Sequence, residues 1–222
     1  MRYFLLIGMI GLGLTAGAQG WDSAYRSTYY EQKLTLFRSL PDSPNEIVFL
    51  GNSITDGGEW AEIWQNTAVK NRGISGDITF GVLARLDEVL SASPQKIFVL
   101  IGVNDIARNI PDSVILLNYK RLIQQVQRES PRTQLIMQSI LPTNNAFKPF
   151  KNHYGKDDHI RAVNAGLLGL CKQYGITYVD LYSRFLDASG KLDVQYTNDG
   201  LHLTGPGYML WKKILIEQKL MP

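Results

Sequence analysis

The sequence predicts an α/β fold in which helices cover both faces of a parallel sheet. Runs of consecutive apolar residues, such as 47–50 and 97–101, are typical of strands that are buried on both faces. Segments with helical spacing, each of about 12–16 residues, alternate with these runs, and such strand–helix–strand units form right-handed crossovers between parallel strands. We therefore expect one three-layer α/β/α domain.

Length and composition agree with a domain that has one core. The chain has 222 residues, of which 45% are hydrophobic. The formal net charge is only +3 and no block of Lys or Arg is present, which argues against nucleic acid as a partner. Cys171 is the only cysteine, so there is no internal disulfide, and no His/Cys cluster indicates zinc. Cys171 shares a helical stripe with Ile160, Val163 and Leu167, which favours a buried thiol.

The first 18 residues have the three parts of a secretory signal peptide. Arg2 precedes the apolar run 3–14, and small residues up to Ala18 follow it, so cleavage is expected after Ala18. A membrane anchor and a buried first strand are the alternatives, but the run is shorter than the ~20 residues that a spanning helix needs. We expect an exported protein, periplasmic or extracellular, with a single domain at 19–222 and no stable membrane anchor.

Apolar spacing and helix breakers assign the elements along the chain. A helix is expected at 21–40, ended by Pro41 and Pro44. Its expected core contacts are the aromatic and apolar residues Tyr25, Tyr29, Leu36, Phe37 and Leu40. Strands are expected at 47–50, 68–73, 96–102, 134–140 and 176–180. The remaining helices are expected at 60–65, 79–90, 113–129, 159–174 and 205–219.

Ser53 is the candidate nucleophile. It follows the buried strand 47–50 in a Gly-Asn-Ser turn, and the carboxyl ends of parallel strands are where open α/β folds bind ligands. A serine needs a base to remove its proton and an acid to orient that base. His202 lies just before the last helix, which Thr204 is expected to cap, and Asp199 lies three residues upstream of His202. Taken alone, this pair also fits an ordinary Asp-Gly turn.

Two further positions offer hydrogen-bond donors for a developing oxyanion. Gly76 follows the second strand, and its small size would let a backbone N–H approach the reacting centre. Asn104 lies just beyond the third strand and can direct its side-chain amide to the same point. Each has an ordinary structural alternative, Gly76 as a turn glycine and Asn104 as a helix N-cap. Because these positions and Ser53 all follow predicted strands, they should share one edge of the sheet.

Four short blocks resemble those of the SGNH (GDSL-type) hydrolase superfamily. They lie at 51–55, 71–77, 102–105 and 199–202, in the family's order and over essentially the whole mature chain. The resemblance implies that Ser53 is the nucleophile, His202 the base and Asp199 the residue that orients it. The implied oxyanion donors are Ser53, Gly76 and Asn104.

The same resemblance has consequences for fold and cofactor. It implies a flavodoxin-like sheet of five strands in the order 2-1-3-4-5, and a mechanism with no metal and no cofactor. The branch with the greatest similarity contains platelet-activating-factor acetylhydrolase-like and sialate O-acetylesterase-like proteins. Asn52 departs from the commonest family form, which has Asp at this position, and its role is open.

Four residues are candidates for substrate contact. Lys148 and Phe150 belong to the insertion 143–158, where lysines could attract a carboxylate such as that of sialate and aromatic rings could stack on a sugar. The alternative for the insertion is a solvated surface loop. Trp60 could line the pocket or pack in the core, and Arg72 could bind substrate or brace the oxyanion turn.

The expected substrate is therefore a short-chain ester, acetyl first, on a small molecule or glycan outside the cell. No broad apolar patch in the sequence indicates a long acyl chain. A lysophospholipase or thioesterase on the same fold is one alternative. A catalytically inactive carbohydrate-binding or scaffold protein is another, although the presence of all five reactive positions argues against it. The sequence does not determine the oligomeric state.

Overall fold

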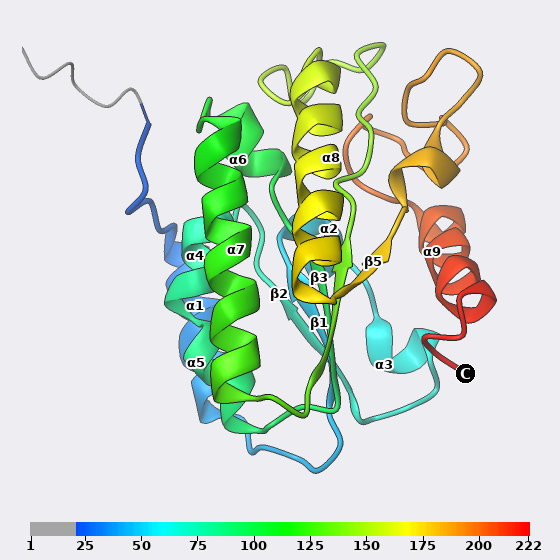
Figure 1. The fold of residues 1–222 in the computed structure, drawn as a ribbon. Helices are drawn as coiled ribbons and strands as arrows, with labels where there is room; N and C mark the ends of the chain where they lie inside the picture. The colour runs from blue at the N-terminus through cyan, green and yellow to red at the C-terminus, as the bar shows by residue number, and fades with distance from the viewer. Residues whose placement is uncertain (1–20) are drawn as a thin grey trace, which may run out of the picture.

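The computed structural model describes residues 21–222, so the predicted signal peptide at 1–18 lies outside the described residues. Five parallel strands form a sheet in the order β2-β1-β3-β4-β5 (Figure 1), which confirms the predicted class and strand order. The strands are β1 (Ile47–Gly51), β2 (Val69–Gly73), β3 (Lys96–Leu100), β4 (Gln134–Gln138) and β5 (Thr177–Val179).

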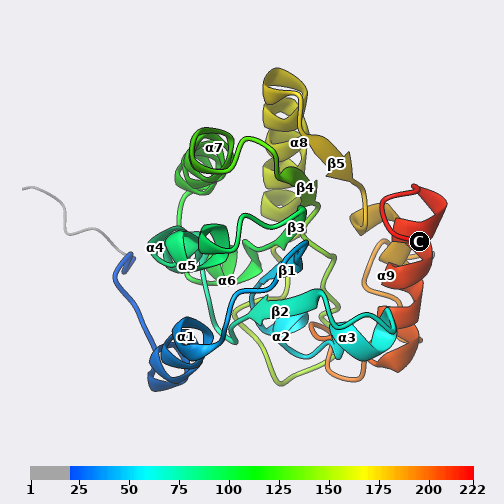
Figure 2. The ribbon, with the colours of Figure 1, turned by 90° about the horizontal axis from the view of Figure 1, so that it is seen from below.

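Helices cover both faces of the sheet, as Figure 2 shows. One face carries α1 (Thr28–Ser39), α4 (Thr79–Ala84), α5 (Leu86–Ser91), α7 (Asp112–Glu129) and α8 (Asp157–Tyr174). The other face carries α3 (Trp60–Ile63) and α9 (Gly205–Glu217). The short elements α2 (Ser53–Asp56), α6 (Val103–Ala107) and η1 (Tyr182–Phe185) follow β1, β3 and β5.

The strand register brings the carboxyl ends of the central strands together. Gly51, the last residue of β1, pairs with Gly73 of β2 and with Leu100 of β3. Because the strands are parallel and end at the same level, the segments that follow them emerge side by side at one edge. This edge carries the nucleophile turn, the turn that contains Gly76, and α6.

A cluster of three aromatic side chains fixes α9 to the sheet. Phe49 of β1 stacks on Trp60 with ring centroids 3.9 Å apart, and Trp211 of α9 packs edge-on against Trp60 at 4.8 Å. Each of the three side chains is at most 1% exposed. Trp211 Nε1 also donates a hydrogen bond to Gln138 Oε1 at 2.7 Å, which satisfies the polar atom that the cluster buries.

The first helix differs from its prediction in extent and in the face that it buries. It begins at Thr28, because the Ser27 side chain accepts a hydrogen bond from Tyr30 N and caps the helix. Of the predicted core contacts only Phe37 is buried, and it shares a stripe with Tyr30 and Leu34 at helical spacing. The predicted contacts that are instead exposed are Tyr25, Tyr29, Leu36 and Leu40.

The predicted helix at 79–90 is interrupted at Arg85, where α4 ends and α5 begins. Arg85 is fully buried, and its guanidinium pairs with Asp77 at 3.0 Å and donates to Gly51 O at 3.1 Å. Its backbone φ of −123° departs from helical geometry. The spacing of apolar residues predicted one continuous helix because it does not show that the charged side chain of Arg85 is buried.

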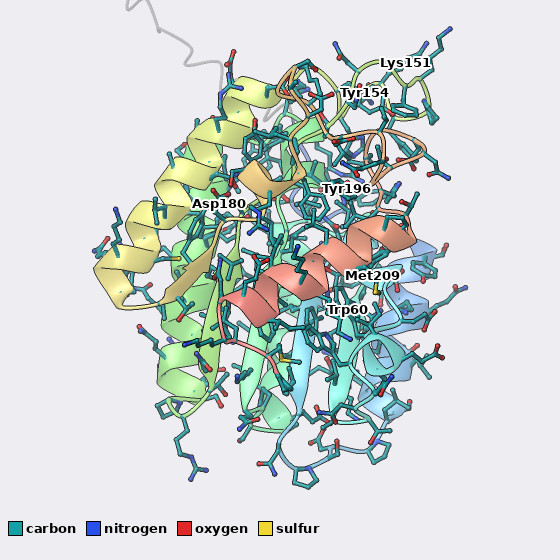
Figure 3. All side chains as sticks on the ribbon, turned by 90° about the vertical axis from the view of Figure 1, so that its right-hand side faces the viewer. Trp60, Lys151, Tyr154, Asp180, Tyr196 and Met209 are labelled. Atoms are coloured by element: carbon teal, nitrogen blue, oxygen red, sulfur yellow. The ribbon has the colours of Figure 1, made fainter. Side chains whose placement is uncertain are left out.

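Trp211→Ala should lower the free energy of unfolding by about 3–5 kcal/mol, since it leaves a cavity in a closely packed cluster. Met209 lies on the same helix but is 48% exposed (Figure 3), so it provides a matched control. Met209→Ala should change the free energy by less than about 0.5 kcal/mol. Urea denaturation followed by circular dichroism measures both, and a Trp211→Ala variant as stable as wild type would contradict the role of the cluster.

Candidate active site

Ser53 is the first residue of α2 and lies directly beyond the carboxyl end of β1. Asn52 caps this short helix, because its Oδ1 accepts a hydrogen bond from Ile54 N at 3.0 Å. Glycine is needed at position 51 because the backbone of β3 lies close to it: a Cβ there would lie 2.2 Å from the carbonyl oxygen of Leu100. The role of Asn52 that the sequence left open is therefore to hold the turn that presents Ser53.

The structure joins Ser53, His202 and Asp199 in a series of hydrogen bonds. Ser53 Oγ donates to His202 Nε2 at 2.9 Å, and His202 Nδ1 donates to Asp199 Oδ2 at 2.7 Å. The ionised Asp199 carboxylate can only accept a hydrogen bond, so Nδ1 of the neutral His202 ring must carry the proton. Nε2 then has no proton and can accept a hydrogen bond. The arrangement can therefore withdraw a proton from the serine hydroxyl.

Asp199 stays ionised in this setting. Burial acts to raise the pKa of Asp199, but hydrogen bonds from His202 and from Leu201 N outweigh burial and hold the pKa below its usual value. Asp199 Oδ1 accepts from the backbone N–H groups of Leu201 and His202, both at 2.8 Å. The carboxylate is thus fixed in position as well as charged.

Contacts from α9 and from the insertion hold the histidine loop. Tyr208 of α9 donates a hydrogen bond to Ile54 O at 2.9 Å, directly behind the nucleophile. The Phe150 ring packs edge-on against the His202 ring with centroids 4.9 Å apart. Thr204 occupies the N-cap position of α9 as predicted, although its side chain makes no capping hydrogen bond.

Three hydrogen-bond donors at the same edge have no acceptor within residues 21–222. They are the backbone N–H groups of Ser53 and Gly76 and one of the two amide hydrogens of Asn104. The other amide hydrogen of Asn104 bonds to Asp77 O at 2.9 Å, which ties α6 to the turn that contains Gly76. Gly76 has a φ of +79°, a backbone conformation that favours glycine, and a Cβ at this position would meet nothing within 4 Å. Glycine is therefore required by the backbone conformation and not, as we expected, by a lack of space for a side chain.

His153 is a site residue that the sequence did not indicate. Its Nε2 lies 2.9 Å from Asn104 Oδ1. Asn104 Nδ2 already donates to Asp77 O, so Oδ1 is the acceptor and His153 Nε2 carries the proton. Burial lowers the pKa of His153, and the charges of His202 and Arg108 lower it further. A neutral His153 therefore holds the Asn104 amide in one orientation.

The insertion 143–158 is held against the site by hydrogen bonds. It therefore differs from the alternative interpretation of the sequence, which was a surface loop surrounded by solvent. Asn144 is buried and its backbone N–H bonds to Gly200 O at 2.8 Å. Tyr154 donates a hydrogen bond to Asp199 O, whereas Lys151 points outward at the exposed end of the same loop (Figure 3). The loop therefore combines residues that hold Asp199 with residues that face solvent.

Two of the four predicted substrate contacts are structural. Trp60 is 1% exposed in the aromatic core and donates to Thr55 O, so its prediction as a pocket residue is wrong. Arg72 is 7% exposed, pairs with Glu88 at 2.8 Å and lies over the Phe37 ring, which makes it a brace between α1 and α5. Trp60 follows the block at 51–55 and Arg72 lies within the block at 71–77, but their burial excludes contact with substrate.

Two hollows in the surface are lined by residues of this site or by their neighbours in the chain. One, of about 320 Å³, is lined by residues 148–153, which include the predicted contacts Lys148 and Phe150; their role stays a prediction. The other, of about 490 Å³, is lined by the aromatic, hydroxyl and turn residues Tyr25, Ser27, Tyr29, Ser75 and Gly76.

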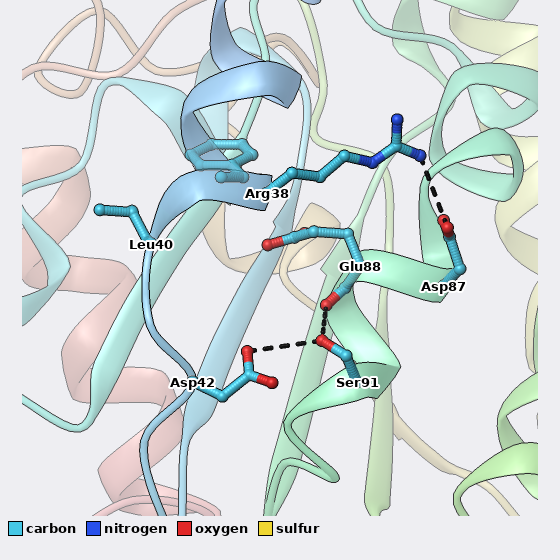
Figure 4. A pocket seen from close by; sticks show the side chains of 7 residues that line it. Arg38, Leu40, Asp42, Asp87, Glu88 and Ser91 are labelled. Carbon is cyan, nitrogen blue, oxygen red and sulfur yellow. Dashed lines mark hydrogen bonds and ion pairs between the residues drawn. The ribbon is translucent and has the colours of Figure 1, made fainter.

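A third hollow, of about 310 Å³, lies between α1 and α5 at the opposite edge of the sheet (Figure 4). Ser91 there donates to Glu88 O and Asp42, and Arg38 pairs with Asp87. It contains no histidine and no nucleophile–base pair, so it is not the site of the chemistry. Within residues 21–222 no cluster of His, Cys, Asp and Glu could hold a metal ion, and no helix is long and apolar enough to cross a membrane.

A parallel α/β sheet that presents a serine, a histidine and an aspartate in this order of hydrogen bonds has the arrangement of an α/β serine hydrolase. The model of the GDSL-like lipase/acylhydrolase family matches residues 49–210. The chain therefore belongs to this family of ester-hydrolysing enzymes, as the four sequence blocks predicted.

Similar proteins agree with this assignment. Platelet-activating factor acetylhydrolase IB subunit alpha2 of Homo sapiens is 25% identical over 173 residues, which cover 75% of this chain and 72% of the relative. A solved Streptococcus pneumonia structure, provisionally described as a platelet activating factor, is 33% identical with a TM-score of 0.78, covering 86% of this chain and 92% of that one. A GDSL-like lipase from Bacteroides thetaiotaomicron is 25% identical with a TM-score of 0.74, covering 85% and 96%.

Asp105 gives the site a pH-dependent stability. It is fully buried beside Asn104 and accepts hydrogen bonds from Thr79 N and Oγ1. Burial raises its pKa from 3.8 to about 7, although the bonds from Thr79 oppose this. Between these values the native protein retains a proton that the unfolded chain has released, so the free energy of unfolding falls as pH rises through this window.

The Asp105→Asn variant lacks this pH-dependent contribution to stability, because an amide side chain does not titrate. Its Oδ1 can still accept the hydrogen bonds from Thr79. We expect the urea midpoint of wild type to fall, relative to that of Asp105→Asn, between about pH 4 and 7. Asp87 is 67% exposed, and Asp87→Asn should follow the wild-type curve. A constant difference between wild type and Asp105→Asn over this range would contradict the assignment.

Proposed function

We propose that the protein is a serine esterase that hydrolyses short-chain esters, acetyl first, on carbohydrates. The observation that carries this proposal is the series of hydrogen bonds from Ser53 Oγ to His202 Nε2 at 2.9 Å and from His202 Nδ1 to Asp199 at 2.7 Å. These contacts support Ser53 as the nucleophile, His202 as its base and Asp199 as the acid that orients the base.

The proposed reaction is acyl transfer in two steps. Ser53 Oγ attacks the ester carbonyl while His202 Nε2 takes its proton, and the carbonyl oxygen becomes an oxyanion. The free N–H groups of Ser53 and Gly76 and the amide of Asn104 donate hydrogen bonds to that oxygen. The alcohol leaves with the proton from His202, and a water molecule activated by His202 then releases the acid from Ser53. Asp199 stabilises the imidazolium that forms in each step.

Two features support the choice of substrate. The curated relatives carry the name acetylhydrolase, which supports a short acyl group. The rings of Tyr25, Tyr29 and Phe150 are partly exposed at the two hollows, and aromatic rings at a binding site suit the faces of a sugar. The predicted export of the chain would bring the enzyme to glycans outside the cell.

A substrate panel tests the proposal. O-acetylated sialic acid, acetylated plant glycans and lysophospholipid are offered to wild type and to Ser53→Ala, and released acid is measured. We expect acetate from at least one sugar and none with Ser53→Ala. Turnover of lysophospholipid alone would show the sugar proposal to be wrong, and no turnover of any ester would favour an inactive binding protein.

Ser53→Ala and His202→Ala should each reduce kcat for p-nitrophenyl acetate by about 10⁴–10⁶-fold, because each removes a group on which both steps depend. Exposed residues of the same types serve as controls. Ser183→Ala and His159→Ala, both at the surface, should retain wild-type rates. A Ser53→Ala enzyme with near-normal rate would refute the mechanism.

His153→Ala should lower kcat by about 10–100-fold with a smaller change in KM, because the freed Asn104 amide can rotate away from the oxyanion. His153→Gln places a side-chain N–H donor at a similar distance and should restore part of the rate. Steady-state kinetics on p-nitrophenyl acetate separates kcat from KM. Equal rates for wild type and His153→Ala would show that Asp77 alone orients Asn104.

A further inference from the structure

A cation that the sequence did not single out is stacked on one of the rings that line the hollow beside Gly76. Arg108 follows α6, and its guanidinium lies on the ring of Tyr25 with Cζ 3.9 Å from the ring centroid. Tyr25 lines the same hollow of about 490 Å³ as Gly76. The backbone N–H of Arg108 bonds to Asn104 O at 3.1 Å, so the backbone of Arg108 lies one helical turn from that of the proposed oxyanion donor.

Arg108 is held in place but its charge is not neutralised. Within residues 21–222 its guanidinium contacts no carboxylate, and the Tyr25 ring is its side-chain partner. Its positive charge also helps to lower the pKa of His153. A guanidinium that stacks on an aromatic ring keeps the N–H groups along its edge available for a planar anion.

Other charged groups near this edge also bear on an anionic ligand. Asp77 and Asp56 are neutralised by Arg85 and Lys33, whereas Asp199 faces a neutral His202 and the buried Asp105 has no cation partner within the described residues. Lys148 and Lys151 of the insertion are exposed and form no ion pair within the described residues. These unpaired lysines add to the attraction that Arg108 exerts on an anion.

We propose that Arg108, held against Tyr25, binds the carboxylate of the substrate, and that the preferred substrates are acetyl esters of acidic sugars. This inference rests on the esterase function proposed above and specifies its substrate class. A carboxylate offers two coplanar oxygens that match the guanidinium edge, and Tyr29 beside it provides a second ring for the sugar. Lys148 and Lys151 then act at longer range by attracting the anion.

Two matched pairs of substrates test the proposal on the full chain. The first pair is the O-acetylated methyl glycosides of glucuronic acid and glucose, and the second is O-acetylated N-acetylneuraminic acid and its carboxamide. We expect kcat/KM of wild type to favour the acid by about tenfold or more in at least one pair at low salt, and less at high salt. No preference in either pair would overturn the inference.

Variants assign the preference to Arg108. Arg108→Gln should bring the ratio of kcat/KM for acid and neutral substrate close to one, and Arg108→Lys should retain part of it, since charge remains without the planar fork. Tyr25→Phe should keep the ratio and Tyr25→Ala should lower it. Arg121, exposed on α7, is the control, and Arg121→Gln should keep the wild-type ratio. A ratio that persists in Arg108→Gln would overturn the inference.

Further substrates separate this inference from the proposed function. Ser53-dependent hydrolysis of p-nitrophenyl acetate without any preference for acids would refute the role of Arg108 alone. Failure to hydrolyse any acetyl ester would refute both proposals. If Arg108→Gln instead impairs only hydrolysis of the acetyl ester of platelet-activating factor, the anion bound is a phosphate, and the acidic-sugar proposal is wrong.

Discussion

The docking of α9 against the sheet is the contact on which the site depends. Ser53 and His202 are 149 residues apart in the chain, and they meet at 2.9 Å. The aromatic packing of Trp211 against Trp60 and Phe49 sets the position of α9, and Tyr208 ties the same helix to the backbone behind Ser53. Since the histidine loop ends where α9 begins, a shift of the helix moves the base away from the nucleophile.

A buried polar network fixes the positions of Gly76 and Asn104, the proposed oxyanion donors. Arg85 joins Asp77 to Gly51 O, and Asn104 joins the same turn to α6 and His153. Buried ion pairs of this kind add little net stability, and the loss of one partner costs about 3–5 kcal/mol because a buried charge is left alone. Their value here is geometric, since they hold the Gly76 turn and Asn104 at fixed positions around Ser53.

The class of fold, which the structure confirms, and the candidate site residues could be named from the sequence because both have local signatures. The apolar strands and the turns after them predicted a parallel sheet with one reactive edge, and the blocks at 51–55 and 199–202 placed Ser53, Asp199 and His202 on it. The errors arose where burial depends on contacts outside the motif. Trp60 follows the block at 51–55 and Arg72 lies within the block at 71–77, but contacts with Trp211 and with Glu88 hold the two side chains in the interior.

The sequence by itself determined the strand order, through family resemblance. It also determined the candidates for nucleophile, base and orienting acid, and the two segments proposed to supply oxyanion donors. The tertiary structure decided which other side chains reach that edge. No sequence pattern marks His153 and Arg108, because the partners that they contact, Asn104 and Tyr25, are 49 and 83 residues away in the chain. Their positions follow from where the insertion and the segment before α1 pack, which depends on the summed contacts of the whole fold.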